Sequence, residues 1–335
     1  MRAVGRILLP QPFSLGLTLL CGQCFRWDGP KQDSWFEGVA GGAHWRLQQE
    51  GEFLNWQCSS ESVRGLAAKE WLSHYLSLDD DMVEWLKEYA AHPMLEQSVK
   101  TLTGLRLIRQ EPWECSVSYM FAQGLSVKVI RQALRKFCAA YGGPVEGAPG
   151  LYAFPEPEQL VGLTAQAMKP FTNNYHARAD RIIRAARVVK TGVISLNHLK
   201  TIPCDDARSA LMGLDGIGPK IADCILLFSL DQASAFPVDR WVLRAMKRHF
   251  RSVKLLGAGE EAPTASQYPK IVEKARRHLG PRCGLASEYL FLFLRLLEDQ
   301  KLREELGPYL SYSLPAFDES PKRPRGKLRL KSGRN

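Results

Sequence analysis

Apolar and polar positions alternate along the first sixty residues of the chain. Phe13, Leu15, Leu17 and Leu19 are separated by small or polar residues, and this period of two predicts a half-buried strand over residues 13–19. Short segments rich in aromatic residues predict three more strands at 35–39, 44–47 and 53–56. Glycine-containing breaks at 41–42 and 51 separate these strands, as in an antiparallel meander.

The hydrophobic spacing becomes helical from about Ser62 onward, beginning with Leu66, Trp71 and Tyr75 and continuing after Met82. Asp79-Asp80-Asp81 precedes the second of these stretches and is interpreted as a helix N-cap and not as a metal site. Further helices are predicted at 113–121, 127–141, 157–168, 175–190, 207–212, 219–230, 239–250, 268–279 and 285–297. The predicted fold class is therefore α+β, with a β-rich start and a helical remainder.

Changes in pattern along the chain predict four segments. Residues 1–95 form a β-rich domain with linking helices, and residues 96–200 form a helical domain that contains the Gly/Pro-rich connector 144–157. Residues 201–312 carry a helical hairpin and the C-terminal helices, and residues 313–335 have the composition of a disordered basic tail.

The net charge of the 335-residue chain is +10, which favours a polyanionic partner. Seven basic residues lie within 322–335, and removing them from +10 leaves only +3 for the rest of the chain. Net charge alone therefore does not establish nucleic-acid binding, and the tail is expected to add salt-dependent, nonspecific affinity.

Eight dispersed cysteines and the absence of a long apolar run indicate an intracellular protein with reduced thiols. Cys21 and Cys24 have the spacing of metal ligands, but no second pair or histidine accompanies them, so neither a metal nor an iron-sulfur cluster is expected. We expect no cofactor and no membrane partner, and a monomer.

The segment 211–224, LMGLDGIGPKIADC, predicts a helix end, a glycine turn and a second helix that starts at Pro219. Gly216 and Gly218 allow close approach of another molecule, and the first N–H groups of the new helix carry a partial positive charge. The turn is therefore a candidate phosphate-binding site. The same turn is also a common way to pack two helices.

Lys220 and Asp239 are the candidate reactive pair. The helix dipole at the start of the second helix disfavours a charged Lys220, and we expect a lowered pKa that helps supply a neutral amine. Taken singly, Lys220 is better explained as an exposed residue or a phosphate contact, and Asp239 is better explained as a helix N-cap.

The chain resembles the glycosylase superfamily built on a helix-hairpin-helix, a Gly/Pro-rich loop and an aspartate, and within it the 8-oxoguanine DNA glycosylases. The resemblance extends to about residues 8–300. It includes the motifs at 22–27 (GQCFRW), 105–115 (LRLIRQEPWEC), 175–178 (YHAR) and 284–291 (GLASEYLF), in the expected order. It implies a TBP-like antiparallel β domain followed by a helical glycosylase core.

The resemblance implies a bifunctional DNA glycosylase and abasic-site lyase of base-excision repair, acting on double-stranded DNA with an oxidised purine. Lys220 would attack C1′ and Asp239 would stabilise the positive charge that develops on the sugar. Cys224 and Phe291 would sandwich the flipped base, and the Gly22 carbonyl would accept the N7 hydrogen that 8-oxoguanine has and guanine lacks. Gly216, Gly218, Ile221 and Trp241 are expected at the DNA backbone, and Tyr175, His176 and Arg178 at the opposite base or as a DNA wedge.

The chain departs from the family pattern mainly where the opposite base is read. Val129 and His176 stand where arginines are expected, and neither side chain reproduces an arginine fork. Ser287 replaces a glutamine that touches the Watson–Crick edge of the lesion. We therefore expect relaxed discrimination among opposite bases.

Two alternatives remain open from the sequence. A monofunctional alkylpurine glycosylase of the 3-methyladenine type would use water and would not cut the strand. A noncatalytic DNA-binding protein would explain the glycine turn but would leave Lys220 and Asp239 as a coincidence.

Overall fold

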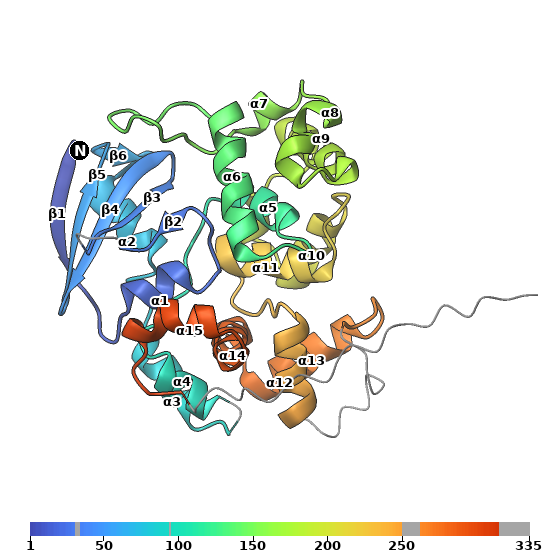
Figure 1. The fold of residues 1–335 in the computed structure, drawn as a ribbon. Helices are drawn as coiled ribbons and strands as arrows, with labels where there is room; N and C mark the ends of the chain where they lie inside the picture. Colours follow the sequence, from blue (N-terminus) through green and yellow to red (C-terminus); the bar gives the residue numbers. More distant parts are fainter. Residues whose placement is uncertain (31–33, 94, 250–261, 315–335) are drawn as a thin grey trace, which may run out of the picture.

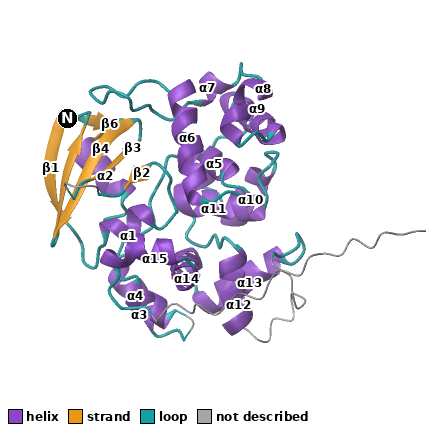
Figure 2. Ribbon diagram, viewed as in Figure 1, coloured by secondary structure: helices purple, strands orange, loops and turns teal. Residues whose placement is uncertain are grey.

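The computed structural model describes residues 1–30, 34–93, 95–249 and 262–314. An antiparallel sheet in the order β1-β5-β4-β3-β2 forms one side of the molecule, and helices form the rest (Figures 1 and 2). The strands are β1 (Ala3–Leu8), β2 (Trp27–Asp28), β3 (Phe36–Ala40), β4 (Ala43–Glu50) and β5 (Phe53–Cys58), with a small pair β6 (Ser62–Val63) and β7 (Leu66–Ala67). The predicted α+β class is confirmed.

The helical part contains longer helices and several short turns. The longer helices are α2 (Ala68–Tyr75), α3 (Met82–Ala90), α5 (Pro112–Phe121), α6 (Val127–Tyr141), α9 (His176–Lys190), α10 (Cys204–Met212), α11 (Pro219–Ser229), α12 (Arg240–His249), α13 (Tyr268–Leu279) and α14 (Cys283–Glu298). The shorter ones are α1 (Leu15–Leu20), α4 (Glu96–Thr101), α7 (Pro157–Leu160), α8 (Ala165–Met168) and α15 (Gln300–Leu306), with 3-10 turns η1 (Lys169–Thr172), η2 (His198–Lys200) and η3 (Gly307–Tyr309). Among the described helices, none combines the length and apolar character needed to cross a membrane.

The segment around residues 13–19 is a helix, so the predicted strand is wrong. Ser14 caps α1 by accepting the Leu17 N–H, and all six residues of the helix are buried. The alternation misled because Gly16 and Thr18 are buried as completely as the leucines beside them. The sheet instead begins at β1, for which no strand was predicted.

Other elements follow the sequence patterns with local differences. The ranges predicted for α6 and α13 are reproduced, and Asp81 caps α3 as expected for the acidic triplet. The single helix predicted at 157–168 is two short helices, because Thr164 caps a new start. Residues 62–67 pair as β6 and β7 before helix α2 begins, and α4 and α15 had not been predicted. The predicted disordered tail lies outside the described residues from 315 onward.

Two hydrophobic cores organise the molecule. One joins the sheet to α1–α4 and α12–α15, and the other joins α5–α11. Figure 1 shows the corresponding two groups of helices, with α11 in the upper group facing α12 and α14 in the lower one. The predicted boundaries at 95, 200 and 312 stay predictions. The space between the two cores contains the candidate site.

Candidate active site

Helices α10 and α11 form a hairpin around the glycine turn at 213–218. Gly216 has φ +89°, a conformation that favours glycine, and a Cβ there would also lie 2.7 Å from Cδ of the Arg181 side chain. The Gln123 amide donates to the Gly216 carbonyl at 2.8 Å and holds the turn in place. Gly218 is the N-cap of α11 and has open space where a Cβ would be, so the first N–H groups of the helix are accessible to an anion.

Asp215 is the acidic residue of this turn, and its charge is balanced. Arg184 pairs with one carboxylate oxygen, and the Nε of Arg181 lies 3.4 Å from the other. The turn therefore keeps its positive potential toward an approaching phosphate.

A cavity of about 320 Å³ lies between α11, α12, α14 and the loop that follows α1. It is lined by seven of the residues singled out from the sequence, namely Gly22, Lys220, Cys224, Asp239, Trp241, Ser287 and Phe291. The structure thus brings the expected reactive pair and the expected base-binding residues into one cavity, although they come from distant segments of the chain.

The loop that carries Gly22 is held against the entrance to the helical core. The Gln23 side chain donates to the carbonyls of Thr18 and Arg106 at 2.9 and 2.8 Å and accepts the Ile108 N–H at 2.9 Å. Gly22 itself has φ +107°, and a Cβ there would lie 3.3 Å from Nη1 of Arg295. The motifs at 22–27 and 105–115 therefore form one unit that fixes the Gly22 wall of the cavity.

Lys220 lies in the first turn of α11, with its Nζ 5.7 Å from the centre of the Tyr119 ring. Interaction with Cys224 and then with Asp239 raises the pKa of Lys220, although burial acts in the opposite direction. The expected lowering of this pKa is therefore wrong for the free protein, because the interactions with Cys224 and Asp239 outweigh the effect of burial. Lys220 must lose a proton before it can act as a nucleophile.

Asp239 precedes α12 and caps it. Its Oδ1 accepts the N–H groups of Trp241 at 2.9 Å and Val242 at 2.8 Å. Burial raises the pKa of Asp239, while these N–H groups and Lys220 oppose the rise. The N-cap interpretation is thus correct, and it is compatible with a reactive role because the carboxylate still faces the cavity.

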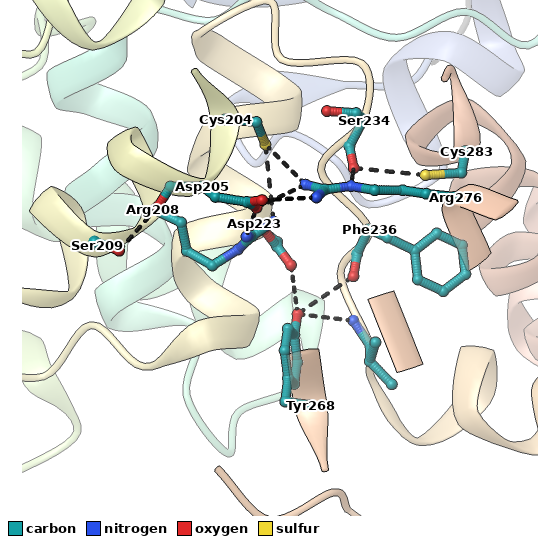
Figure 3. Close-up of polar contacts among 11 residues, drawn as sticks. Cys204, Asp205, Arg208, Ser209, Asp223, Ser234, Phe236, Tyr268, Arg276 and Cys283 are labelled. Carbon is teal, nitrogen blue, oxygen red and sulfur yellow. Dashed lines mark hydrogen bonds and ion pairs between the residues drawn. The ribbon is translucent and has the colours of Figure 1, made fainter. Parts of the chain in front are cut away.

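A buried polar network behind the cavity supports the loop that carries Asp239 (Figure 3). Asp223 on α11 is fully buried and accepts the Arg208 Nε at 2.6 Å and the Tyr268 hydroxyl at 2.8 Å. The same hydroxyl accepts the Val238 N–H at 3.2 Å. Because Val238 directly precedes Asp239, the network links the position of Asp239 to the helix that carries Lys220.

The outer part of this network connects α10 and α13. Arg276 forms two hydrogen bonds of 3.0 Å to the Asp205 carboxylate and donates through Nε to the Ser234 carbonyl at 3.0 Å, as Figure 3 shows. Arg208 also pairs with Asp205. The hairpin, the loop before α12 and helix α13 are therefore bound together by ion pairs and hydrogen bonds.

A second hollow of about 990 Å³ shares Lys220 and Asp239 with the cavity and extends along the hairpin. Gly216, Gly218 and Ile221, three residues for which a contact with the DNA backbone is predicted, are among its lining residues. Trp241, which we expected at the same surface, is only 9% exposed and lies in the cavity wall, where the guanidinium groups of Arg240 and Arg244 cover its ring.

The expected opposite-base residues lie at the start of α9. Tyr175 is 51% exposed and His176 is also exposed, so both are accessible to a partner. Arg178 is buried instead, and its guanidinium donates to the carbonyls of Gln123 and Thr172. Arg178 therefore joins α9 to the loop at residues 122–126, which lines both the cavity and the second hollow. Val129 is exposed on α6.

Sequence reasoning missed Glu288, which also lines the cavity and is buried. A charged residue within the apolar stretch of α14 was the available signal. Asp223 and Tyr268 were missed as well, because their roles depend on contacts between separate helices.

Two family models match the chain. The model of the 8-oxoguanine DNA glycosylase N-terminal domain matches residues 6–115, and that of the HhH-GPD superfamily of base excision DNA repair proteins matches residues 117–262. The match to the first model ends, and that to the second begins, within helix α5.

Several known proteins are similar over most of the chain. An N-glycosylase/DNA lyase OGG1 of Arabidopsis thaliana is 27% identical over 83% of this chain and 76% of its own length. The N-glycosylase/DNA lyase of Saccharomyces cerevisiae is 27% identical over 62% of this chain, which spans 58% of that relative's length.

Among solved structures, the Clostridium acetobutylicum 8-oxoguanine glycosylase/lyase bound to double-stranded DNA with cytosine opposite 8-oxoG superposes with a TM-score of 0.74. It is 27% identical, and the match covers 88% of this chain and 97% of that one. Because the two family models together match residues 6–115 and 117–262, the chain belongs to the HhH-GPD superfamily of base excision DNA repair proteins and to its 8-oxoguanine DNA glycosylase branch.

Proposed function

We propose that this protein is a DNA glycosylase that removes 8-oxoguanine from double-stranded DNA and then cuts the strand as an abasic-site lyase. The observation that carries the proposal is that Lys220 and Asp239 share one cavity, which opens beside the hairpin turn. A phosphate seated at that turn would place the DNA backbone next to the cavity, so a nucleotide rotated out of the helix would enter it.

The chemistry follows from the residues in the cavity. The neutral amine of Lys220 attacks C1′, the bond from C1′ to the base breaks, and the bonding electrons leave with the base, which gains a proton. Asp239 stabilises the positive charge on the sugar as this bond breaks. Ring opening gives a Schiff base on Lys220, and loss of a C2′ proton then expels the 3′ phosphate.

The base would be held between Cys224 and Phe291, with its N7 edge toward Gly22. These residues lie in the cavity wall on α11, on α14 and in the loop after α1. Burial raises the pKa of Cys224 to about 12, so at neutral pH it is a thiol that packs against the base and not a competing nucleophile. The proposed working form is a single chain on DNA inside the cell.

Borohydride trapping tests the mechanism directly. The wild-type protein should form a covalent complex with an 8-oxoguanine duplex, and Lys220→Gln should abolish both this complex and base release. Lys270→Gln is the matched control, because Lys270 is an exposed lysine in the first turn of α13. Base release without any trapped complex in the wild-type protein would contradict the Schiff base and favour a monofunctional glycosylase.

We also propose that the opposite base is read loosely. Val129 and His176 lack the guanidinium fork that would pair with a base edge, and Arg178 donates to main-chain carbonyls. Rates on duplexes with cytosine, adenine, guanine or thymine opposite 8-oxoguanine should differ by no more than about tenfold. A strict preference for cytosine would show that other residues supply the discrimination.

A further inference from the structure

Arg295 is a cation in the wall of the base cavity to which the proposed mechanism assigns no role. It lies on α14, one turn after Phe291, and both side chains line the cavity. The guanidinium carbon of Arg295 is 5.2 Å from the centre of the Phe291 ring. A base stacked on Phe291 would therefore have a guanidinium group beside it.

Arg295 also approaches the main chain at Gly22. Its Nη1 lies 3.5 Å from the Cys21 carbonyl oxygen and 3.3 Å from where a Cβ on Gly22 would be. A side chain larger than hydrogen at position 22 would crowd this nitrogen. The guanidinium therefore occupies the corner of the cavity at which the Phe291 ring and the Gly22 loop meet.

The guanidinium is only weakly bound to other groups of the protein. The Cys21 carbonyl is at the outer limit of a hydrogen bond, and the Asp299 carboxylate lies 3.7 Å from Nη2. The Nε of Arg295 has no hydrogen-bond partner among the described residues and is not buried, and the side chain is 14% exposed. An arginine has five N–H donors, so several remain available to a molecule in the cavity.

Among the described residues, the other polar side chains that α14 contributes to the cavity wall offer no comparable donor. The Ser287 hydroxyl donates to the Gly284 carbonyl of the same helix at 2.6 Å. Glu288 is 4% exposed, and its Oε1 is buried without a partner. Arg295 is therefore the group of α14 that can donate to the base.

We propose that the Arg295 guanidinium donates a hydrogen bond to the oxygen on C8 of the extruded purine. In the proposed pose the N7 edge of the base faces Gly22. Because C8 is bonded to N7, its oxygen projects toward the corner that Arg295 occupies. Unmodified guanine and adenine carry a hydrogen on C8, which accepts no hydrogen bond. This inference rests on the proposed function and adds a specificity-determining residue to it.

The same contact acts on the chemical step. When the bond from C1′ to the base breaks, the bonding electrons leave with the base, and part of the negative charge reaches the C8 oxygen through the ring. A guanidinium at that oxygen stabilises this charge and so raises the rate of base release. Strand cleavage at a site that has already lost its base gains nothing from Arg295, because no C8 oxygen is present.

The first experiment compares single-turnover rates of the full-length wild-type protein, Arg295→Met and Arg295→Lys. Methionine removes the charge and the donors, so the rate on an 8-oxoguanine duplex should fall about 10- to 100-fold, and lysine should restore part of it. Cleavage of a duplex with a preformed abasic site should stay within about threefold of wild type. Arg277→Met is the matched control, because Arg277 is an exposed arginine that also pairs with a carboxylate one turn away.

A second experiment replaces the C8 oxygen by sulfur. 8-Thioguanine in its thione form keeps the hydrogen on N7, but its sulfur is a weaker acceptor than oxygen. The wild-type rate should fall about 10-fold from 8-oxoguanine to 8-thioguanine, whereas the two bases should differ by less than about threefold in Arg295→Met. Differences in size and leaving ability between the two bases are the same for both proteins and cancel in this comparison.

A third measurement follows binding without reaction. In the Lys220→Gln background, the ratio of affinities for 8-oxoguanine and guanine duplexes should fall about 10-fold when Arg295→Met is added. Urea unfolding of each variant checks that it is folded under the assay conditions. An unchanged affinity ratio in a folded variant would overturn the inference.

The kinetic outcomes are equally decisive. An unchanged rate of Arg295→Met on 8-oxoguanine would overturn the inference, and so would an oxygen-to-sulfur rate ratio equal to that of wild type. Equal losses on the 8-oxoguanine and abasic duplexes would overturn it too, because Arg295 would then act on the DNA backbone or on Lys220. A wild-type protein that neither releases 8-oxoguanine nor is trapped by borohydride would instead refute the proposed function, and the inference with it.

Discussion

Two buried carboxylates, Asp223 in the network behind the cavity and Glu288 in its wall, differ in what surrounds them. Asp223 on α11 accepts hydrogen bonds from Arg208 and Tyr268 and so has a partner at each oxygen. Glu288 on α14 has a carboxylate oxygen with none. Burial raises the pKa of both groups. At Asp223 the ion pair with Arg208 and the hydrogen bond from Tyr268 oppose the rise, whereas at Glu288 a hydrogen bond from Cys21 and the charges of Arg295 and Lys220 oppose it. Where a buried charge is paired, it organises structure. Where a carboxylate oxygen is buried without a partner, its burial costs folding stability.

The largest predicted effect is on the paired carboxylate. Asp223→Ala leaves Arg208 and Tyr268 without their buried partner, and the free energy of unfolding should fall by roughly 3 to 5 kcal/mol. Urea unfolding measures this. Asp205→Ala is the control, because Asp205 is 65% exposed, and it should cost less than about 1 kcal/mol. Equal losses of unfolding free energy in the two variants would show that the buried Asp223 stabilises the fold no more than the exposed Asp205 does.

The next effect has the opposite sign and concerns the unpaired carboxylate. The pKa of Glu288 is about 7 in the folded protein against an ordinary 4.5, so folding is penalised when the group is ionised. The penalty is absent below about pH 4.5, grows as the pH rises from about 4.5 to about 7, and is complete above about pH 7. The unfolding free energy of Glu288→Gln minus that of wild type should therefore be roughly 3 kcal/mol larger at pH 8 than at pH 4.5.

Unfolding free energies of wild type and Glu288→Gln at the two pH values provide the measurement. Taking the difference between pH values cancels any fixed cost of burying the new amide. A gap between the proteins that does not change with pH would mean that Glu288 is stabilised in the folded state by partners comparable to those of Asp223.

The smallest predicted effect tests the link between the Asp223 network and the cavity that contains Asp239. Tyr268→Phe removes the hydroxyl that joins Asp223 to the Val238 N–H, at a cost of about 1 to 3 kcal/mol. Base excision should also slow, because Asp239 follows Val238 directly. Tyr312→Phe removes an exposed hydroxyl and should change neither property. If Tyr268→Phe loses stability but keeps the full excision rate, the network does not position Asp239.

Much of the helical architecture follows from local pattern. The ranges of α6 and α13, the start of α11 at Pro219 and the cap at Asp81 were predictable, because helical spacing and capping act within a few residues. The first strand and α1 were not. In α1 every side chain is buried, so the periodicity that normally distinguishes a helix from a strand carries no information.

The sequence by itself determined the reactive elements of this protein: a glycine turn before a helix, Lys220 in the first turn of that helix, Asp239 nineteen positions later, and a family pattern extending beyond them. Only the tertiary structure decided their chemical environment. It placed Cys224 and Asp239 close enough to raise the pKa of Lys220, turned Ser287 and Arg178 toward backbone carbonyls, and left one oxygen of Glu288 buried without a partner. Local capping and periodicity depend on near neighbours in the chain, whereas burial, ion pairing and pKa depend on groups that only folding brings together.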